Sequence, residues 1–595
     1  MNGPGGMQIM GAQAGGVQAG GVPMQARQTP MATMADPPVA DAEPGRRRRL
    51  VVVGNGMAGA RAIEEVLSRG GDELFDITVF GAEPYGNYNR ILLSNVLSGA
   101  HDAADIFINP LAWYEENAIT LHAGVRASEI DRAARIVTGD NGVVAPYDVL
   151  LIATGSRSFI PPLQGLNGAD GRMRPGVFGF RTIDDCDAIV ATAATSRRAV
   201  VIGGGLLGLE AARGLMNHGC EVHVVHLGKH LMEAQLDATA GGILRTAMEA
   251  MGVRIHLETS TAAILGEDRV TGLAFKDGTT LDCDMVVVSA GIRANVEIGR
   301  ECGLSVERAI LVDDAMRSVD DLAVYVVGEC AQHRGRVYGL VAPLWEQARV
   351  FADRVTGVDP EATYTGSKLA TKLKVMGVEL ASMGLTEPAD ERDEVVQFTE
   401  ARRGTYKKLI VRDGRLVGGI LMGDISKAAY LMQAFDRDSP LPHERLSLLF
   451  DMGAPAQAVT LDEMPAAAQV CNCNGVSKAT LGACVEAGER DPKAVMAATR
   501  AGMGCGSCKG LVAEVVAWFA ARVDAAAPGP EEEGTVSLLP RMVDGLIEVE
   551  ELLRISEVAK KYNVARVRLT EGRRIDFAGL SAEDGALLRA ELEQA

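Results

Sequence analysis

Four cysteines near the carboxyl end of the chain stand in two close pairs. Cys471 and Cys473 form a Cys-x-Cys pair, and Cys505 and Cys508 form a Cys-x-x-Cys pair after the intervening residues 474–504. Four such sulfur atoms could form disulfides, bind zinc, hold an iron–sulfur cluster or serve as reactive thiols. The rest of the sequence bears on the choice among these chemistries.

The amino-terminal region indicates whether the protein is exported, and therefore whether the four cysteines could form disulfides. Residues 1–45 are rich in Met, Gly, Gln, Ala and Pro, which predicts a disordered tail. The tail lacks the apolar centre of a signal peptide, and the arginines at 46–49 lead into a buried strand instead of an export signal. We therefore expect a cytoplasmic protein, whose reducing compartment disfavours disulfides.

Composition limits the partners. The net charge of −19 disfavours nucleic acid and anionic membranes as partners. No apolar run reaches the roughly 18 residues that a membrane span needs. The 595 residues, of which 47% are hydrophobic, predict a globular protein of roughly three to five domains.

The spacing of the cysteines helps to distinguish a zinc site from an iron–sulfur cluster. Zinc ribbons normally repeat Cys-x-x-Cys twice on hairpins. Here one pair is Cys-x-Cys, and helical patterns at 478–489, 491–502 and 511–523 adjoin the pairs. The uneven spacing favours a cluster over zinc and leaves both open. Cys484 lies in an apolar helical pattern, so we expect it in the core.

A glycine-rich turn follows the first buried strand. The stretch "RRLVVVGNGMAGARAIEEVL" places Gly54, Gly56 and Gly59 between a β-run and a helical pattern, the context in which Gly-x-Gly-x-x-Gly predicts dinucleotide binding. The pyrophosphate of the nucleotide would lie at the helix N-terminus. Glu83, at the end of the next strand, is the expected acid for a ribose hydroxyl.

The same pattern recurs in "RRAVVIGGGLLGLEAARGL". Gly203, Gly205 and Gly208 follow a strand, and Glu210 opens the helix. The second strand ends at His226, where an acid that binds NAD would stand, and Lys229 and His230 follow. These basic residues could bind the 2′-phosphate of NADP or face solvent, so NADH and NADPH both stay open.

Two dinucleotide sites in one chain predict hydride transfer between a nicotinamide and a flavin. The stretches with Thr154-Gly155 and Gly328-Glu329 resemble signatures of the pyridine nucleotide-disulfide oxidoreductase superfamily, and 289–295, with Gly291, resembles its return strand. The resemblance implies FAD at the first turn and NAD(P)H at the second. It also implies that Gly328 and Glu329 face the flavin ribityl chain, with Glu329 in place of the usual Asp.

The stretch in which single-cysteine members of that superfamily carry their thiol has no cysteine here. It reads "YGNYNRILLSNVLSG", which argues against disulfide reductase and peroxidase roles. Arg90 stands where relatives similar to rubredoxin reductase have a Lys, which implies contact with the isoalloxazine ring or the phosphate of FAD. The alternative is a surface Arg at a helix start. Alternating strands from 366 to about 445, with an Asp413-Gly414 hairpin, predict a small interface domain.

The cysteine-rich segment resembles the [2Fe–2S] domain of bacterioferritin-associated ferredoxin, including "GMGCGSC" before a helix. That resemblance implies Cys471, Cys473, Cys505 and Cys508 as cluster ligands. The order of the domains resembles the N-terminal portion of NAD(P)H-dependent nitrite reductase large subunits and the electron-transfer subunit of assimilatory nitrate reductase. The final segment, including Thr570 to Arg574, resembles the ferredoxin-like half-domain of nitrite and sulfite reductases.

The sequence thus predicts an α/β protein: two Rossmann-like (three-layer ββα) dinucleotide-binding domains, a small α+β interface domain, a small helical [2Fe–2S] domain and a C-terminal α+β half-domain. The expected boundaries are a disordered tail at 1–45, an FAD-binding domain at 46–160 and 285–350, an NAD(P)H-binding domain at 161–284, an interface domain at 364–447, a [2Fe–2S] domain at 468–522 and a half-domain at 535–595.

The expected reaction passes hydride from NAD(P)H to FAD and then single electrons through the cluster, with no catalytic side chain. No cysteine follows Cys508, so we expect either a truncated nitrite reductase or a chain that works with a separate polypeptide, which would carry the sirohaem nitrite reductase or nitrate reductase centre that accepts the electrons. An NAD(P)H:ferredoxin or rubredoxin-type reductase is the alternative enzyme, and a non-catalytic redox sensor or scaffold is the alternative of another class. The resemblance also admits a homodimer.

Overall fold

The computed structural model describes residues 46–595 except 169, 451–460, 463, 472–473, 503–507, 527–535, 539–548, 565–566, 570–574, 578–579 and 594–595. The chain divides into two compact units at residue 458. The predicted disordered tail, Cys473, Cys505 and the predicted motif at Thr570 to Arg574 lie outside the described residues.

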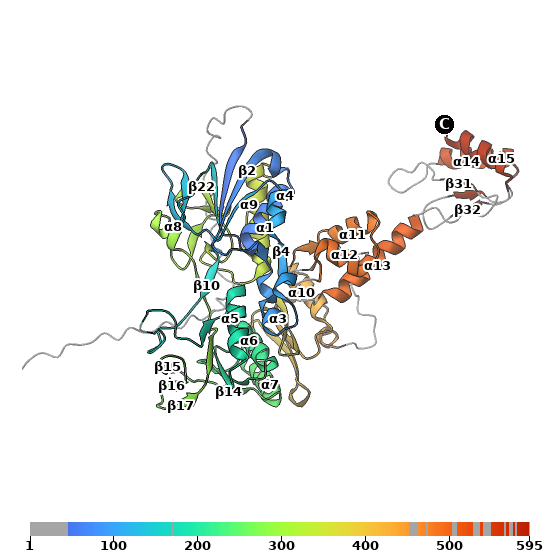
Figure 1. The fold of residues 1–595 in the computed structure, drawn as a ribbon. Coiled ribbons are helices and arrows are strands. Elements are labelled where there is room, and N and C mark those ends of the chain that lie inside the picture. Colours follow the sequence, from blue (N-terminus) through green and yellow to red (C-terminus); the bar gives the residue numbers. More distant parts are fainter. Residues whose placement is uncertain are drawn as a thin grey trace, which may run out of the picture. The chain divides into compact units, whose positions relative to one another are not determined.

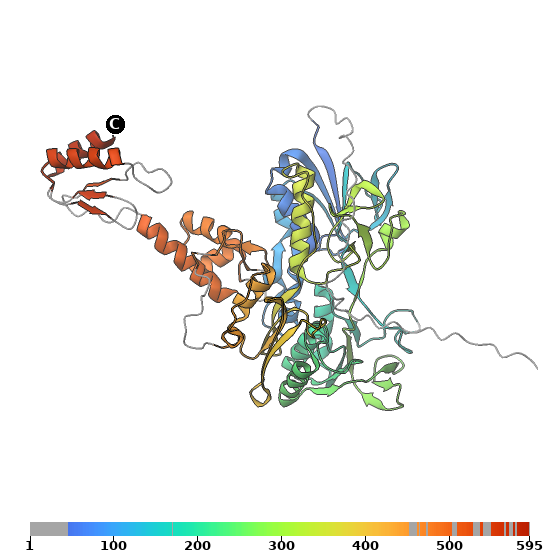
Figure 2. The ribbon, with the colours of Figure 1, turned by 180° about the vertical axis from the view of Figure 1, so that it is seen from behind.

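An eight-stranded sheet of order β23-β20-β21-β22-β9-β1-β2-β5 opens the first unit (Figure 1). Strand β1 (Arg48–Val53) runs parallel to β2 (Phe75–Gly81) and to β9 (Val149–Ile152). Its Leu and Val side chains are buried, as expected for a parallel strand covered on both faces. Helices α1 (Met57–Leu67) and α9 (Val341–Thr356) lie side by side in this part of the fold (Figures 1 and 2).

A three-stranded antiparallel sheet, β6-β7-β8, contributes Ile130 and Val137 to the same apolar core. The other elements around the eight-stranded sheet are α2 (Gly71–Leu74), β3 (Asn87–Tyr88), η1 (Arg90–Leu92), α3 (Leu93–Leu97), η2 (Ala103–Ile106), β4 (Phe107–Asn109), α4 (Leu111–Glu116), β5 (Thr120–Ala123), β6 (Ala127–Asp131), β7 (Ile136–Gly139), β8 (Val144–Pro146), α8 (Glu297–Glu301), β20 (Ile310–Val312), β21 (Arg317–Ser318), β22 (Asp321–Val326) and β23 (Ala331–His333).

A second, five-stranded parallel sheet has the order β11-β18-β12-β13-β14. Helix α6 (Leu206–Asn217) follows β12 (Arg198–Ile202), as α1 follows β1, so the strand–turn–helix unit occurs twice. Its other elements are β11 (Val177–Gly179), α5 (Ile183–Ala193), β13 (Glu221–Val225), α7 (Ala238–Ala250), β14 (Arg254–His256), β15 (Thr261–Leu265), β16 (Gly272–Phe275), β17 (Thr280–Asp282) and β18 (Met285–Val288).

The chain passes between the two sheets through an antiparallel ribbon of β10 (Ser156–Ser158) and β19 (Ile292–Ala294). Beyond the paired residues, Asn295 N–H donates to Gly155 O (2.9 Å) and Phe159 N–H donates to Gly291 O (2.8 Å). The predicted return segment at 289–295 therefore includes one strand of this ribbon.

A third sheet, β24-β25-β28-β27-β26, is antiparallel. One face packs into the core of the second sheet through Tyr406, Ile420 and Met422, and α10 (Ala428–Asp436) packs with the other face. The predicted Asp413-Gly414 turn joins β27 and β28, with both residues at positive φ (50° and 73°). The remaining elements are β24 (Ala370–Val375), β25 (Val378–Gly384), β26 (Glu394–Glu400), η3 (Ala401–Arg403), β27 (Thr405–Arg412), β28 (Arg415–Met422) and η4 (Arg445–Leu448).

A buried polar cluster fastens the third sheet to the second. Asp237 caps α7 by accepting the Ala240 N–H (2.8 Å), and its other oxygen accepts from Tyr406 Oη and from Lys408 Nζ (2.9 Å). The side chains of Asp237 and Lys408 are 3% and 6% exposed, so this ion pair is largely withdrawn from water.

The second unit contains two small cores. The first joins β29 (Gln469–Cys471), β30 (Val476–Ser477), α11 (Lys478–Glu486), α12 (Pro492–Thr499) and α13 (Lys509–Ala526). The second joins a sheet of order β31-β33-β32 with helices α14 and α15, whose bounds are β31 (Val536–Leu538), α14 (Val549–Lys561), β32 (Val567–Leu569), β33 (Ile575–Phe577) and α15 (Ala582–Glu593).

The predicted fold class is confirmed: two α/β sheets with glycine turns, a small α+β sheet, a helical segment and a small C-terminal α+β segment. The domain boundaries given above stay predictions. Among the described residues, no helix combines the length and the apolar character needed to cross a membrane.

Candidate cofactor-binding site

The three glycines of the first turn have different tasks. Gly54 adopts φ +116°, and a Cβ built there would lie 2.3 Å from the Ala153 carbonyl oxygen. A Cβ on Gly59 would lie 2.1 Å from the Gly54 oxygen, so both positions need glycine for α1 to pack against the sheet. A Cβ on Gly56 would meet nothing within 4 Å. The space before the N-terminus of α1 is therefore open, as the approach of a pyrophosphate requires.

The second turn repeats this geometry. Gly203 (φ +129°) and Gly208 would each carry a Cβ 2.1 Å from a backbone oxygen, of Ser289 and Gly203 respectively. Gly205 at the N-terminus of α6 faces open space. Neither α1 nor α6 has a side-chain cap, which leaves their first N–H groups available to an anion. Both turns fit a dinucleotide.

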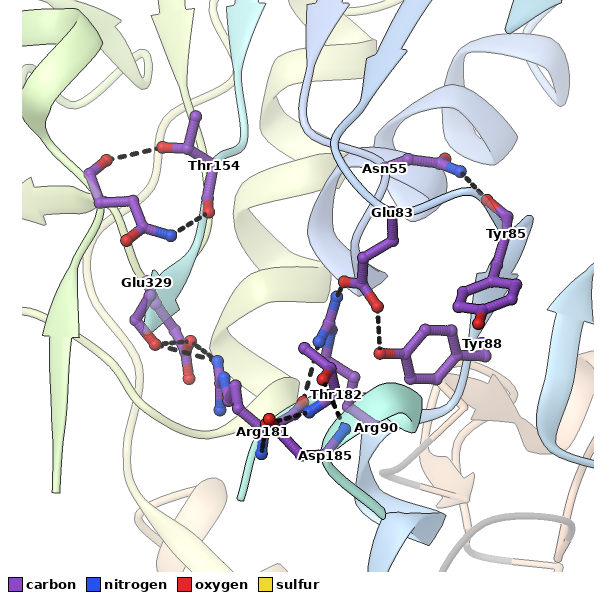
Figure 3. Close-up of polar contacts among 12 residues, drawn as sticks. Asn55, Glu83, Tyr85, Tyr88, Arg90, Thr154, Arg181, Thr182, Asp185 and Glu329 are labelled. Atoms are coloured by element: carbon purple, nitrogen blue, oxygen red, sulfur yellow. Dashed lines mark hydrogen bonds and ion pairs between the residues drawn. The ribbon is translucent and has the colours of Figure 1, made fainter. Parts of the chain in front are cut away.

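Glu83 is held by two neighbours beside the first turn (Figure 3). Its Oε2 accepts from Tyr88 Oη (2.7 Å), and its Oε1 pairs with Arg90 Nη2. Arg90 also donates from Nη1 to the Arg181 carbonyl (3.0 Å) and lies over the Tyr88 ring. The expected contact of Arg90 with FAD stays a prediction, while its observed task is to orient Glu83.

A second acid–arginine pair stands opposite the first. Glu329 Oε2 accepts from Ser156 Oγ (2.6 Å) and pairs with Arg181 Nη2, and its side chain is 12% exposed (Figure 3). Arg181 Nε is buried and has no hydrogen-bond partner. Such an unsatisfied donor at the expected ribityl position fits a polar ligand that is absent from the structure.

The sheet ends between these pairs are shaped by backbone contacts. Thr154 Oγ1 donates to Asn295 O (2.7 Å), and Asn295 Nδ2 donates to Thr154 O (2.9 Å). Gly155, Gly291 and Gly328 all have positive φ, and Gly328 allows close approach of Ala58. The predicted signatures therefore meet in space, with the Thr154-Gly155 turn bound to the ribbon.

Glu210 on α6 lies near Ser94 of α3, a helix that packs against α6. Burial raises the pKa of Glu210 to about 7, although the Ser94 contact opposes the shift. His226, in contrast, is bound to the glycine turn that precedes α6, since its Nδ1 accepts the Gly204 N–H (3.1 Å).

One cysteine does adjoin the flavin signature, since Cys330 follows Glu329. It is fully buried, its Sγ donates to Val327 O (3.3 Å), and burial raises the pKa of its thiol. We therefore assign it to the core and not to thiolate chemistry.

The described cysteines of the second unit share one apolar cluster. Cys471 ends β29 and is buried, and Cys508 packs against the same cluster just before α13. Cys484 lies on α11 and packs against the same cluster, as predicted. No group of three or more metal-ligating side chains occurs within the described part of the chain, which leaves out Cys473 and Cys505.

Sequence reasoning missed four residues of this site: Tyr88, Ser156, Arg181 and Asn295. Arg181 had a signal, because it precedes Thr182, which forms a capping box with Asp185 at the start of α5. Ser156 and Asn295 had no local signal, since each acts through a partner distant in sequence, whereas Tyr88 acts through Glu83, which is near in sequence but has no motif that marks the pair.

Comparisons with known proteins agree with this geometry. The family model described as pyridine nucleotide-disulphide oxidoreductase matches residues 48–349. Three further models match in order: the rubredoxin NAD+ reductase C-terminal domain at 370–438, the BFD-like [2Fe-2S] binding domain at 469–518 and the nitrite/sulfite reductase ferredoxin-like half domain at 528–595.

Curated relatives and a solved structure extend the likeness. A nitrite reductase [NAD(P)H] from Bacillus subtilis is 39% identical over 90% of this chain and 75% of its own length. An assimilatory nitrate reductase electron transfer subunit from the same organism is 33% identical over 92% and 78%. A ferredoxin reductase from Rhodopseudomonas palustris has 25% identity and a TM-score of 0.59, covering 66% of this chain and 96% of its own.

Proposed function

The chain belongs to the pyridine nucleotide-disulphide oxidoreductase family, and we propose that it delivers electrons from NAD(P)H to a centre that reduces nitrite. The predicted enzyme class, an NAD(P)H-dependent oxidoreductase, and the predicted cofactors FAD, NAD(P)H and [2Fe–2S] are confirmed. The acceptor and the residue roles are the proposal.

One observation carries the proposal: a reductase with two nucleotide turns and a [2Fe-2S]-binding domain occupy one chain, in the order of a nitrite reductase that matches 90% of it. FAD supplies, when bound, the conversion of a two-electron hydride into single electrons. A cluster in the same chain is the natural recipient of single electrons.

The side chains of the first site bind and orient. The N-terminus of α1 and the open space at Gly56 would hold the pyrophosphate of FAD, and Glu83 would meet the adenosine ribose. Arg90 keeps Glu83 in place, because it pairs with the carboxylate directly. Arg181 and Glu329 would hold the ribityl region, with the free Arg181 Nε as a donor.

The second site holds the nicotinamide nucleotide. The N-terminus of α6, opened by Gly205, would bind its pyrophosphate. Glu210, with a pKa of about 7, could carry or release a proton near neutral pH at the boundary between α6 and α3. The cluster would be held by Cys471, Cys473, Cys505 and Cys508.

The acceptor is proposed as a sirohaem nitrite reductase centre or, as in the Bacillus subtilis relative, a nitrate reductase. The match of residues 370–438 to the rubredoxin NAD+ reductase C-terminal domain favours a second candidate, an NAD(P)H:ferredoxin or rubredoxin-type reductase. The cytoplasmic location stays a prediction from the sequence.

Anaerobic titration of the purified protein with NADH and with NADPH tests the proposal. We expect bleaching of the flavin absorbance, followed by the paramagnetic signal of a reduced [2Fe–2S] cluster. In Cys508→Ser the flavin should still bleach while iron content and the signal fall, and in the matched control Cys484→Ser both should persist, because Cys484 belongs to the core of α11.

Two results would count against the proposal. Flavin that is not reduced by either nucleotide would remove the electron input. Stoichiometric zinc without iron would remove the electron relay. With the cluster reduced, faster oxidation by rubredoxin than by a nitrite reductase polypeptide would favour the second candidate.

A further inference from the structure

Strand β13, which comes next after α6 in the second sheet, is followed by His226 where dinucleotide folds commonly place an acid for the adenosine ribose. The His226 ring does not offer a positive charge there. Its Nδ1 accepts the Gly204 N–H (3.1 Å) and must be unprotonated to do so. Burial also lowers the pKa of His226, so the ring is neutral at neutral pH.

His230, the second basic candidate, is committed to packing. A Cβ built on Gly241 of α7 would lie 2.7 Å from His230 Nδ1, which shows that the ring rests against the helix backbone. Its Nδ1 also lies 3.1 Å from the Leu231 carbonyl oxygen. Of the three basic residues, only Lys229 is exposed.

An acid reaches the same place from further along the chain. Glu233 Oε1 accepts the Lys229 N–H (3.0 Å), and its Oε2 lies 3.7 Å from His226 Nε2. A Cβ on Gly228 would lie 2.3 Å from Glu233 Oε2, so the carboxylate rests directly on the loop backbone. Its side chain is 47% exposed and therefore open to a ligand.

We propose that Glu233 supplies the acid missing from the end of β13 and selects NADH over NADPH. A carboxylate accepts hydrogen bonds from ribose hydroxyls, whereas a 2′-phosphate would bring two or nearly two negative charges against it. The loop glycine Gly228 lets the acid lie close to the backbone, and the open position at Gly205 sets the pyrophosphate nearby on the same sheet edge. This inference rests on the proposed assignment of the nicotinamide nucleotide to the second turn.

Calorimetric titration of the full-length, FAD-loaded protein with NAD+ and NADP+ tests it, because the oxidised nucleotides bind without turnover. We expect wild type to bind NAD+ at least about tenfold more tightly than NADP+. Glu233→Gln should bring the two dissociation constants to within about threefold, and Glu233→Arg should invert the preference.

Two controls separate the effect of Glu233 from general changes of charge. Glu267→Gln removes an exposed carboxylate from the turn between β15 and β16 and should leave the ratio unchanged. Lys229→Met should also leave it unchanged if Glu233 sets the preference.

Three outcomes overturn the inference: equal or tighter binding of NADP+ by wild type, an unchanged ratio in Glu233→Gln, or a selective loss of NADP+ binding in Lys229→Met. If wild type bound neither nucleotide, the proposed function would fail, and the inference with it. Binding of both nucleotides with equal affinity would leave the proposed function standing and refute only the role of Glu233.

Discussion

Gly56 and Gly59 stand three residues apart, yet alanine at the two positions should affect different properties. We expect Gly59→Ala to lower the stability of the protein and Gly56→Ala to weaken FAD binding. In Gly59→Ala the new methyl group would lie 2.1 Å from the Gly54 carbonyl oxygen, so α1 must move away from the sheet. Overpacking of this kind typically costs about 1–3 kcal/mol, and a backbone obstacle places the cost at the upper end. In Gly56→Ala the methyl group would meet nothing within 4 Å, and the backbone (φ −83°, ψ −175°) suits any residue. The stability of the apoprotein should then change by no more than about 0.5 kcal/mol.

FAD binding should show the opposite pattern, because Gly56→Ala should weaken it although this variant leaves the stability of the apoprotein almost unchanged. The Gly56→Ala methyl group would occupy the open space at the N-terminus of α1, so we expect the FAD dissociation constant to rise at least about tenfold, or about 1.4 kcal/mol. The stability measurement must use flavin-free protein, because bound FAD stabilises the folded state by mass action. Urea unfolding of both apoproteins and titration with FAD provide the two numbers.

Either of two results would refute this reasoning. Gly56→Ala that binds FAD as tightly as wild type would mean that the open space does not receive the pyrophosphate. Gly59→Ala that unfolds at the wild-type urea concentration would mean that the helix adjusts without cost. Gly204, whose Cβ would meet the His226 ring at 2.8 Å, is not a suitable neutral control.

Three further predictions concern the second turn, the interface and acid stability. Gly205→Ala should weaken binding of NAD+ about tenfold by calorimetry while the flavin content stays at the wild-type level, because only α6 is affected. Lys408→Met should lower the free energy of unfolding by about 3 kcal/mol because it leaves the buried Asp237 carboxylate without its cationic partner, and the added change Asp237→Asn should restore part of the loss; an unaltered urea midpoint would contradict this. Burial raises the pKa of Asp148, but its hydrogen bonds with Arg49 outweigh this and lower it from 3.8 to about 2. Since the folded-state pKa lies below the unfolded value, this contribution of about 2 kcal/mol is present above about pH 4 and is lost as the pH falls toward 2, so Asp148→Asn should destabilise at pH 7 and flatten the acid dependence of urea unfolding.

The features that could be predicted from the sequence are those with local causes. The glycine turns at 54–59 and 203–208 were predictable because a strand, a tight turn and a helix impose their limits within a few residues. The Asp413-Gly414 hairpin follows from the positive φ that both turn residues need.

The features that escaped prediction depend on partners far apart in the chain. Arg181 and Glu329 pair across 148 positions, and Thr154 and Asn295 across 141. His226 shows a second limit of prediction from the sequence, because its residue type suggests a cation that would bind the 2′-phosphate of NADP. Only the structure shows that the Gly204 N–H occupies its Nδ1 and that Glu233 stands beside it.

The ribbon of β10 and β19 has a mechanical consequence. Two antiparallel strands joined by hydrogen bonds, with the reciprocal Thr154–Asn295 bonds at one end, resist sliding past each other while they can still bend. The Asp237–Tyr406–Lys408 cluster ties the second sheet down at another point. That cluster joins the second sheet to the third, so it is the ribbon that opposes shear between the two nucleotide-bearing sheets while still allowing them to hinge about it.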